Sequence, residues 1–316
     1  MKHPNSNNSY NEETKEEGPK LASILGVEDK MHRPLRVKPK MYGHRGSFYE
    51  EPENTIPSFQ RALDHGMQGF ELDVFLLKCG SVVVFHGDGG DKVPGGLKGY
   101  CGVPGSISNL SFDDAKELEF KGNAHVCPEE KLNGASIPLL EEVLQYVKEN
   151  YRSAEIKIEL KGQDTELPVI ELVEEMGMVD RCTYSSFYHD RIHKVRTLRP
   201  QRDENGVHVY RTGALFMDPP DDFIEQAKKV DATEVHLRFD TCSKERVDAI
   251  HKAGLDSLSW FRGHPAMKKD IKRFQDLDDE DERVYKMVLH TGVKAICVNH
   301  PRRLSNLVSN IETMTN

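Results

Sequence analysis

One segment near the amino terminus holds side chains that together could cut a phosphodiester bond with the help of a divalent metal. They are His44 and Arg45 in a Gly-His-Arg-Gly turn, Glu71 and Asp73 in an apolar run, and His86 after a Val-Val-Val-Phe run. Imidazoles can take and give a proton near neutral pH, an arginine can bind phosphate oxygens, and paired carboxylates can hold a cation.

The two carboxylates stand two residues apart in Gly-Phe-Glu-Leu-Asp-Val-Phe, so a strand would turn Glu71 and Asp73 to the same face. Like charges in a partly desolvated place repel unless a cation neutralises them. Residues 155–161 alternate in the same way, so Glu159 would add a third oxygen ligand and Lys161 could reach a phosphate. Oxygen ligands suit one divalent cation, Mg²⁺ or Ca²⁺. The structural alternative is an internal salt-bridge ladder without metal.

Each of the two histidines ends an apolar run. A single histidine in such a place is more often a hydrogen-bonded structural residue than a catalyst. The presence of Arg45 and the two carboxylates in the same segment favours a catalytic role. His44 and His86 could then act as a pair in which one takes a proton and the other gives one. Arg45 offers a planar fork to phosphate oxygens, and Gly43 and Gly46 allow a sharp turn close to a ligand.

From Val37 onward, short apolar runs alternate with helical patterns, which is typical of a parallel sheet. The predicted strands are Val37–Tyr42, Gly69–Phe75 with a hairpin partner Ser81–Phe85, Glu155–Leu160, Cys182–Phe187, Ala214–Phe216, Glu234–Leu237, Leu255–Trp260 and Ala295–Val298. With the hairpin pair as one unit, eight strands alternating with helices over about 275 residues predict an α/β fold, a (β/α)8 TIM barrel with a Gly-rich insertion after the second strand.

The first predicted helix has clear ends. Asn54 or Thr55 could cap its start, Pro57 fits its first turn, and Gly66 could end it. Glu53 and Asn54 could instead touch the site, although capping alone is a sufficient explanation for Asn54.

Three regions depart from the alternation of strands and helices. Residues 1–35 are polar and predict a disordered tail, followed by one barrel domain over residues 36–316. The insertion, about residues 87–134, is rich in glycine and predicts either a cap over the barrel mouth or a surface excursion. An acidic run over residues 276–282 indicates a solvated face in preference to a metal site.

Composition narrows the class of protein further. The net charge of the 316 residues is −9 without a long Lys/Arg block, which argues against a nucleic-acid-binding protein. No run approaches about 18 apolar residues and no secretory signal is evident, so we expect a cytoplasmic protein without a transmembrane segment. The cysteines are scattered and expected to be reduced, although Cys101 and Cys127 share the insertion and their pairing stays open. The sequence gives no indication of oligomeric state.

Taken together and in order, the motifs from His44 to about Arg302 resemble the glycerophosphodiester phosphodiesterase family of phosphatidylinositol-phospholipase-C-like barrels. They are His-Arg-Gly (44–46), Pro-Glu-Asn-Thr (52–55), Glu-Leu-Asp (71–73), His86, Ile-Pro-Leu-Leu-Glu-Glu-Val (137–143), Ile-Glu-Leu-Lys (158–161), Ser-Phe (186–187) and Trp260.

The resemblance implies metal-dependent hydrolysis of small-molecule glycerophosphodiesters to glycerol phosphate and an alcohol, through a cyclic phosphate that water then opens. It implies Glu71, Asp73 and Glu159 as metal ligands, His44 and His86 as acid and base, Arg45 and Lys161 as phosphate-binding groups, and Trp260 beside the substrate. Plain packing is the alternative role for Trp260.

Two positions differ from the family's usual pattern. The family usually follows the second histidine with aspartate, whereas Gly87 precedes Asp88 here. The usual Thr-Asp-x-Pro appears as Val-Asn-His-Pro, with Asn299 in the place of the aspartate. We expect these changes to bear on substrate choice more than on chemistry.

Two other functions stay open. One is cleavage of a lysolipid head group, as in lysophospholipase D or sphingomyelinase D type enzymes, which would need an apolar groove beside the barrel mouth. Phe48, Tyr49 and Leu97 are weak candidates to line it. The other is a non-catalytic barrel that binds phosphate or lipid head groups.

Overall fold

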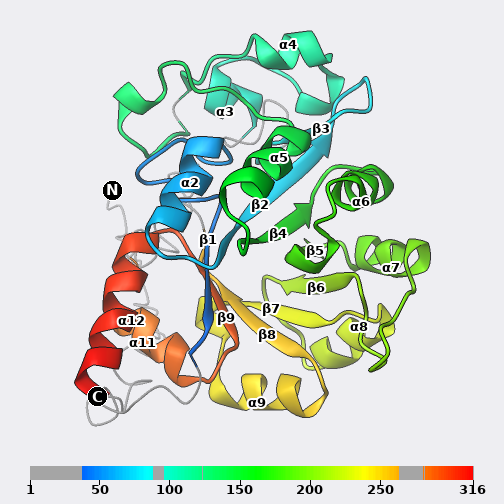
Figure 1. Cartoon of the computed structure of the whole chain (residues 1–316), viewed down its shortest axis with the longest axis vertical. Helices are drawn as coiled ribbons and strands as arrows, with labels where there is room; N and C mark the ends of the chain where they lie inside the picture. Colours follow the sequence, from blue (N-terminus) through cyan, green and yellow to red (C-terminus); the bar gives the residue numbers. More distant parts are fainter. Residues whose placement is uncertain (1–37, 88–95, 123, 263–279, 281, 316) are drawn as a thin grey trace, which may run out of the picture. The chain divides into compact units, whose positions relative to one another are not determined.

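A closed barrel of parallel strands forms the centre of this computed structural model, which describes residues 38–87, 96–122, 124–262, 280 and 282–315 (Figure 1). Its strands in the described residues are β1 Lys40–Gly43, β2 Gly69–Leu76, β4 Glu155–Leu160, β5 Cys182–Ser186, β6 Arg211–Phe216, β7 Glu234–Arg238, β8 Asp256–Trp260 and β9 Ala295–Val298. They pair in parallel in that order, and β1 pairs with both β2 and β9, which closes the cylinder. The predicted (β/α)8 barrel is confirmed.

The hairpin predicted next to the second strand is also present. Strand β3, Val82–Val84, pairs antiparallel with β2, which leaves eight parallel strands in the described part of the barrel. The observed strand bounds differ from the predicted ones by three residues or fewer because apolar runs mark strand interiors better than strand ends.

Helices lie around the outside of the barrel (Figure 1). Their bounds are α2 Ile56–Asp64, α3 Leu97–Cys101, α4 Phe112–Lys116, α5 Leu140–Asn150, α6 Glu166–Glu175, α7 His189–Leu198, α8 Phe223–Lys229, α9 Lys244–Lys252, α11 Glu282–His290 and α12 Pro301–Thr315, with 3₁₀ turns η2 Ile107–Asn109, η3 Glu129–Lys131, η4 Val179–Arg181 and η5 Phe239–Thr241. Within the described residues, none of the helices combines the length and apolar character that a membrane crossing requires.

The alternating pattern of β2 separates packing from chemistry. Phe70, Leu72 and Val74 are fully buried in the apolar cluster that β2 and β4 share with α5 and α6. Each such side chain stabilises the fold by about 1.5–3 kcal/mol when fully buried. The residues between them, Glu71 and Asp73, point to the opposite face because side chains alternate along a strand.

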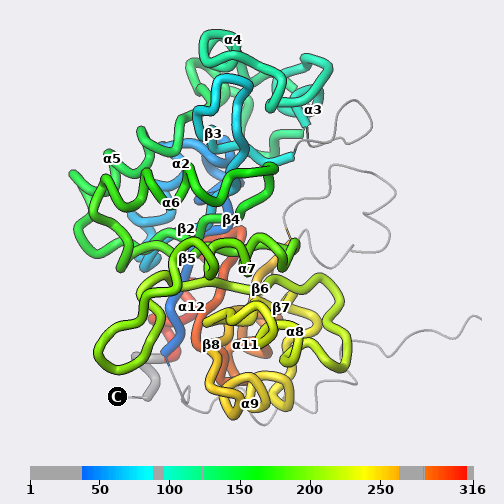
Figure 2. The backbone as a smooth tube through the Cα atoms, turned by 90° about the vertical axis from the view of Figure 1, so that its right-hand side faces the viewer, coloured from blue at the N-terminus to red at the C-terminus, as the bar shows by residue number. Residues whose placement is uncertain are grey.

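The insertion forms a small packed unit of its own. Helices α3 and α4 lie beside β3 in both views (Figures 1 and 2), and Leu97 and Ile107 pack with Val83 and Phe85 in one apolar cluster. The cysteines of this unit, Cys101 and Cys127, are buried free thiols. The predicted tail, residues 1–35, and the start of the insertion, residues 88–95, lie outside the described residues.

Candidate active site

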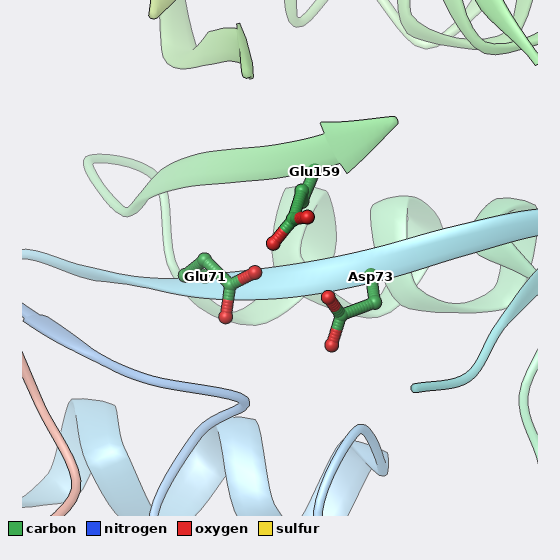
Figure 3. A group of neighbouring side chains, drawn as sticks. All are labelled: Glu71, Asp73 and Glu159. Atoms are coloured by element: carbon green, nitrogen blue, oxygen red, sulfur yellow. The ribbon is translucent and has the colours of Figure 1, made fainter. Parts of the chain in front are cut away.

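Three carboxylates converge at the end of the barrel where the parallel strands terminate. Glu71 and Asp73 come from β2 and Glu159 from β4, and the strand register places Asp73 opposite Glu159. Each offers one oxygen within 4.8 Å of the others. Figure 3 shows the three side chains pointing toward one another, and all three are buried. The structure thus brings together the predicted metal ligands.

The donor set fits a hard divalent cation. Among the described residues, Glu71 Oε1 and Asp73 Oδ1 are buried without a hydrogen-bond partner. Together with Glu53 the three carboxylates carry four negative charges, whereas the adjacent Arg45 and Lys161 carry two positive charges. Two negative charges are left over, which one Mg²⁺ or Ca²⁺ would neutralise with oxygen ligands that suit either ion.

The same imbalance shows in the acidities of the carboxyl groups. Burial raises the pKa of Glu71 well above its usual range, and Asp73 and Glu159 raise it further. Burial, with Asp73 among the charges that add to it, also raises the pKa of Glu159 to about 7. Burial alone would raise the pKa of Asp73 too. Neighbouring groups, among which the charge of Lys161 has the largest effect, nevertheless hold the pKa of Asp73 below its usual value. Glu71 is therefore the carboxylate with the weakest compensation by cations.

The turn after β1 brings the backbone close to these carboxylates. Arg45 has a positive φ of 53° and its N–H donates to Glu71 Oε2 at 3.1 Å, while its Nε lies 3.4 Å from Asp73 Oδ2. Gly46 has a φ of 87°, and a Cβ there would lie 2.4 Å from Ser58 Oγ. Only glycine fits this position, and the strained Arg45 is held by contacts on both sides.

Both predicted acid/base histidines reach the same end of the barrel. His44 Nε2 lies 3.8 Å from Glu71 Oε2, and His86 Nδ1 lies 3.8 Å from Glu53 Oε1. Burial, followed by the charge of Arg45, lowers the pKa of His44 to about 3, and burial and Arg45 also lower the pKa of His86. Each neutral imidazole has one nitrogen that donates a hydrogen bond and one whose lone pair can accept a hydrogen bond or a proton.

Further polar residues contact this site. Glu53 accepts from Arg45 Nη1 at 3.1 Å. Tyr100, which the insertion supplies from α3 and which the sequence did not single out, is buried near Glu53, and burial followed by the charge of Glu53 raises the pKa of its hydroxyl. Asn54 Nδ2 donates to Asp73 Oδ2 at 2.9 Å, while Thr55 alone caps α2. Of the two caps that the sequence allowed, Thr55 is the one present, and Asn54 takes the other role that the sequence left open, a contact with the site.

One further residue, Asn299, contacts His44. Nδ1 of His44 lies 2.7 Å from Oδ1 of Asn299. Asn299 occupies the sequence position at which the family usually has aspartate. Asn299 hydrogen-bonds in turn to Glu280, a member of the acidic run that is only 2% exposed. The prediction of a solvated face was wrong for Glu280, although Glu282 is exposed; residues 276–279 and 281 lie outside the described residues.

Comparison with known proteins agrees with this geometry. The sequence profile of the glycerophosphoryl diester phosphodiesterase family matches residues 44–303. The chain belongs to this family. A glycerophosphodiester phosphodiesterase of Caldanaerobacter subterraneus is 27% identical over 277 residues, covering 86% of this chain and 98% of that protein. One of Bacillus altitudinis is 31% identical over 222 residues, covering 67% of this chain and 81% of that protein.

A solved structure supports the same assignment. The crystal structure of a putative glycerophosphodiester phosphodiesterase from Galdieria sulphuraria has 29% identity, covers 87% of this chain and 99% of its own, and superposes with a TM-score of 0.71. The family and the phosphodiesterase class expected from the motifs are therefore confirmed.

Two more residues that the family resemblance implies lie at the strand ends. Lys161 Nζ is 3.3 Å from Asp73 Oδ1 and 3.5 Å from Glu159 Oε1, and its side chain keeps 21% exposure, so it can reach a ligand above the carboxylates. Trp260 ends β8 and is 7% exposed, with its ring edge-on to Phe187 at 5.5 Å. Its Nε1 has no hydrogen-bond partner among the described residues.

An open groove of about 620 Å³, lined by polar as well as apolar side chains, lies beside the ends of β5 and β6. It is lined by Phe187, Tyr188, His189, Asp190, Leu215, Phe216, Met217, Asp218, Pro220 and Gln226. Tyr188 and Met217 are exposed, and Phe187 links the groove to Trp260. The residues proposed from sequence to line such a groove lie elsewhere: Phe48 and Leu97 are buried, and Tyr49 stacks on His300.

Proposed function

We propose that this protein hydrolyses glycerophosphodiesters to glycerol phosphate and an alcohol with one Mg²⁺ or Ca²⁺ held by Glu71, Asp73 and Glu159. The observation that supports the proposal is the convergence of three buried carboxylates beside two imidazoles, with Glu71 Oε1 lacking a hydrogen-bond partner among the described residues. A cation held there supplies positive charge that stabilises the phosphoryl oxygens as negative charge develops on them.

The residues around the carboxylates would bind the phosphate and transfer protons. Arg45 and Lys161 would bind the phosphate oxygens, which positions phosphorus between the two imidazoles. One imidazole takes the proton of the neighbouring glycerol hydroxyl as its oxygen attacks phosphorus. The other, charged as imidazolium beside the anionic phosphate, gives its extra proton to the departing alcohol as the P–O bond breaks and is left neutral. Water then opens the cyclic phosphate with the two proton transfers reversed.

The direct test is hydrolysis of glycerophosphocholine before and after complete removal of metal. Turnover should vanish with chelator and return with Mg²⁺ or Ca²⁺. His44→Ala and His86→Ala should each lower turnover by about 10²–10⁴-fold, the usual contribution of an acid or base. His193→Ala, on the exposed face of α7, is the matched control and should be silent.

Two outcomes would overturn parts of this proposal. Full turnover after exhaustive chelation would exclude the metal mechanism. No turnover on any diester, with phosphate still bound, would favour a barrel that only binds head groups.

A second candidate substrate class is a lysolipid, because the groove at β5 and β6 adjoins the residues at the barrel mouth. An acyl chain lying on Tyr188 and Met217 would cover exposed apolar surface. Tyr188→Ser and Met217→Ser should each lower kcat/KM for lysophosphatidylcholine about tenfold, since each side chain offers about 1.5 kcal/mol of burial. Glycerophosphocholine, which has no acyl chain, should be hydrolysed as before.

Leu167→Ser is the control for the groove variants, because Leu167 is an exposed apolar residue of α6 that does not line the groove. Equal losses on both substrates, or losses in the control, would count against acyl binding at this place.

A further inference from the structure

The residues around Asn299 determine the direction of its hydrogen bond with His44. Nδ1 of His44 lies 2.7 Å from the side-chain oxygen of Asn299, and both residues are buried. An imidazole nitrogen can either donate or accept, and an asparagine amide can present either its oxygen or its NH₂. The tautomer of His44 therefore follows from the orientation of the Asn299 amide.

The neighbours of Asn299 permit one orientation. Its Nδ2 donates to the carbonyl oxygen of Arg262 at 2.8 Å and to the carboxylate of Glu280. A carbonyl and an ionised carboxylate only accept, so a rotated amide would set oxygen against oxygen on both sides. Asn299 Oδ1 consequently faces His44, and Nδ1 of the imidazole must carry the hydrogen.

Glu280 is itself held in place by its donors. It accepts from the backbone N–H of Asn299 at 3.1 Å and from the hydroxyl of Tyr285, in addition to the Asn299 amide. These donors offset part of the cost of burying a carboxylate, although burial still raises the pKa of Glu280 to about 7. Glu280 is buried against Asn299, whereas Glu282, two residues later, is exposed to solvent. The burial of Glu280 therefore requires an explanation.

We propose that Glu280 is a positioning residue that orients Asn299 and thereby fixes the Nδ1–H tautomer of His44. In this tautomer the lone pair is on Nε2, the nitrogen 3.8 Å from Glu71 that faces the carboxylates. Under the proposed function, on which this step rests, His44 Nε2 takes the proton of the attacking hydroxyl as the new O–P bond forms. His86, charged as imidazolium beside the anionic phosphate, then gives its extra proton to the leaving alcohol as the old P–O bond breaks.

The charge-exchange pair Glu280→Gln and Glu280→Gln/Asn299→Asp tests this arrangement. In the single variant, the glutamine that replaces Glu280 can donate to Asn299 Oδ1, so only the Arg262 carbonyl still opposes a turned amide and the share of the Nε2–H tautomer should rise. In the double variant, the aspartate that replaces Asn299 accepts from both the new glutamine and His44 Nδ1–H whichever way its carboxylate rotates, which fixes the Nδ1–H tautomer although one carboxylate oxygen then faces the Arg262 carbonyl. The single variant should lower kcat about 10- to 100-fold with KM changed less than about threefold, and the double variant should recover most of kcat.

The decisive readout is the imidazole ¹⁵N spectrum of His44 in the full chain without substrate, assigned by its loss in His44→Gln. Wild type and double variant should show Nδ1–H, and Glu280→Gln a shift toward Nε2–H. Glu282→Gln, the matched control, should change neither spectrum nor kcat. An Nε2–H signal in the wild type, or an unchanged tautomer and kcat in Glu280→Gln, would overturn the proposal. Because no substrate is present, the spectrum remains informative even if the protein hydrolyses no diester.

Discussion

Substitution Glu71→Gln should stabilise the metal-free protein and abolish its activity at the same time. Glu71 faces two other carboxylates within 4.8 Å and, in the described residues, its ion-pair contact is with His44, which burial keeps neutral. Glutamine keeps an oxygen that can accept from the Arg45 N–H but removes the charge. A purely structural salt-bridge ladder would respond in the opposite direction, since losing a buried partner destabilises.

Coulomb's law sets the scale of the effect. Two unit charges about 4.8 Å apart repel by about 3.5 kcal/mol at an effective dielectric constant near 20, so Asp73 and Glu159 oppose the ionised Glu71 by about 7 kcal/mol. The charges of Arg45 and Lys161, and uptake of a proton by Glu71, offset much of this repulsion. We expect Glu71→Gln to raise the free energy of unfolding by about 1–3 kcal/mol without metal.

The sign of the pH dependence follows from the raised pKa of Glu71. Below the unfolded pKa of about 4.3, Glu71 is protonated in both states and the variant gains nothing. As the pH rises toward the higher folded pKa, the wild type loses stability because its folded state binds the proton more tightly. The difference between wild type and variant should therefore grow as the pH rises above about 4.3 and persist above the folded pKa of Glu71.

Thermal and urea unfolding at pH 8, with chelator and with Mg²⁺ or Ca²⁺, would measure these differences. The variant's gain corresponds to about 2–4 °C in Tm for each kcal/mol. Metal at 100 times its Kd should stabilise the wild type by about 2.7 kcal/mol and leave the variant nearly unchanged. Glu155→Gln, which removes a partner of Lys40 from the same strand as Glu159, should lower stability with or without metal. A destabilised Glu71→Gln in chelator would refute this account of the site.

Two further substitutions test the supporting charges. Glu53→Gln should lower kcat/KM about 10- to 100-fold, measured on glycerophosphocholine, because Glu53 holds Arg45 at 3.1 Å and lies 3.8 Å from His86; unchanged kinetics would remove it from the site. Lys157→Met should lower the free energy of unfolding, measured in urea, by about 3–5 kcal/mol, because it leaves the buried charge of Glu234 without its lysine partner. The double variant Lys157→Met/Glu234→Gln should recover part of that loss. Additive losses in the double variant would contradict the pairing.

The residues that could be found from the sequence are those whose role follows from strand periodicity. Glu71, Asp73 and Glu159 alternate with fully buried apolar residues, so a strand assignment alone turns them toward one another. His44 follows β1 directly, at the end of a parallel strand. His86 comes two residues after β3, which runs antiparallel to β2 and returns the chain toward Asp73, where the Phe85 N–H donates to the Asp73 carbonyl oxygen at 2.9 Å. Local spacing was sufficient for these positions.

The residues that escaped are those whose partners lie far away along the chain. Tyr100 reaches Glu53 because the insertion folds back onto Phe85, and Asn299 meets His44 across 255 positions. Glu280 stood in a run of acidic residues that looked uniformly solvated, and its burial depends on donors from Asn299 and Tyr285. The composition of such a run predicts the average exposure of its residues, whereas the tertiary contacts of Glu280 determine the burial of that one residue.

Strand β4 carries two kinds of buried charge, and their balance distinguishes structure from function. Lys157 lies 2.8 Å from Glu234, which also contacts His236 at 2.8 Å, so this inner group pairs its charges. Two residues further along the same face, Glu159 joins a group with more negative than positive charge. Burial of an unbalanced group costs stability that packing elsewhere in the barrel must offset, and a bound cation would remove that cost. Neutralising substitutions two residues apart on β4 should consequently change stability in opposite directions: a loss for Lys157 in the paired group, and a gain for Glu159, whose pKa burial raises to about 7, when metal is absent.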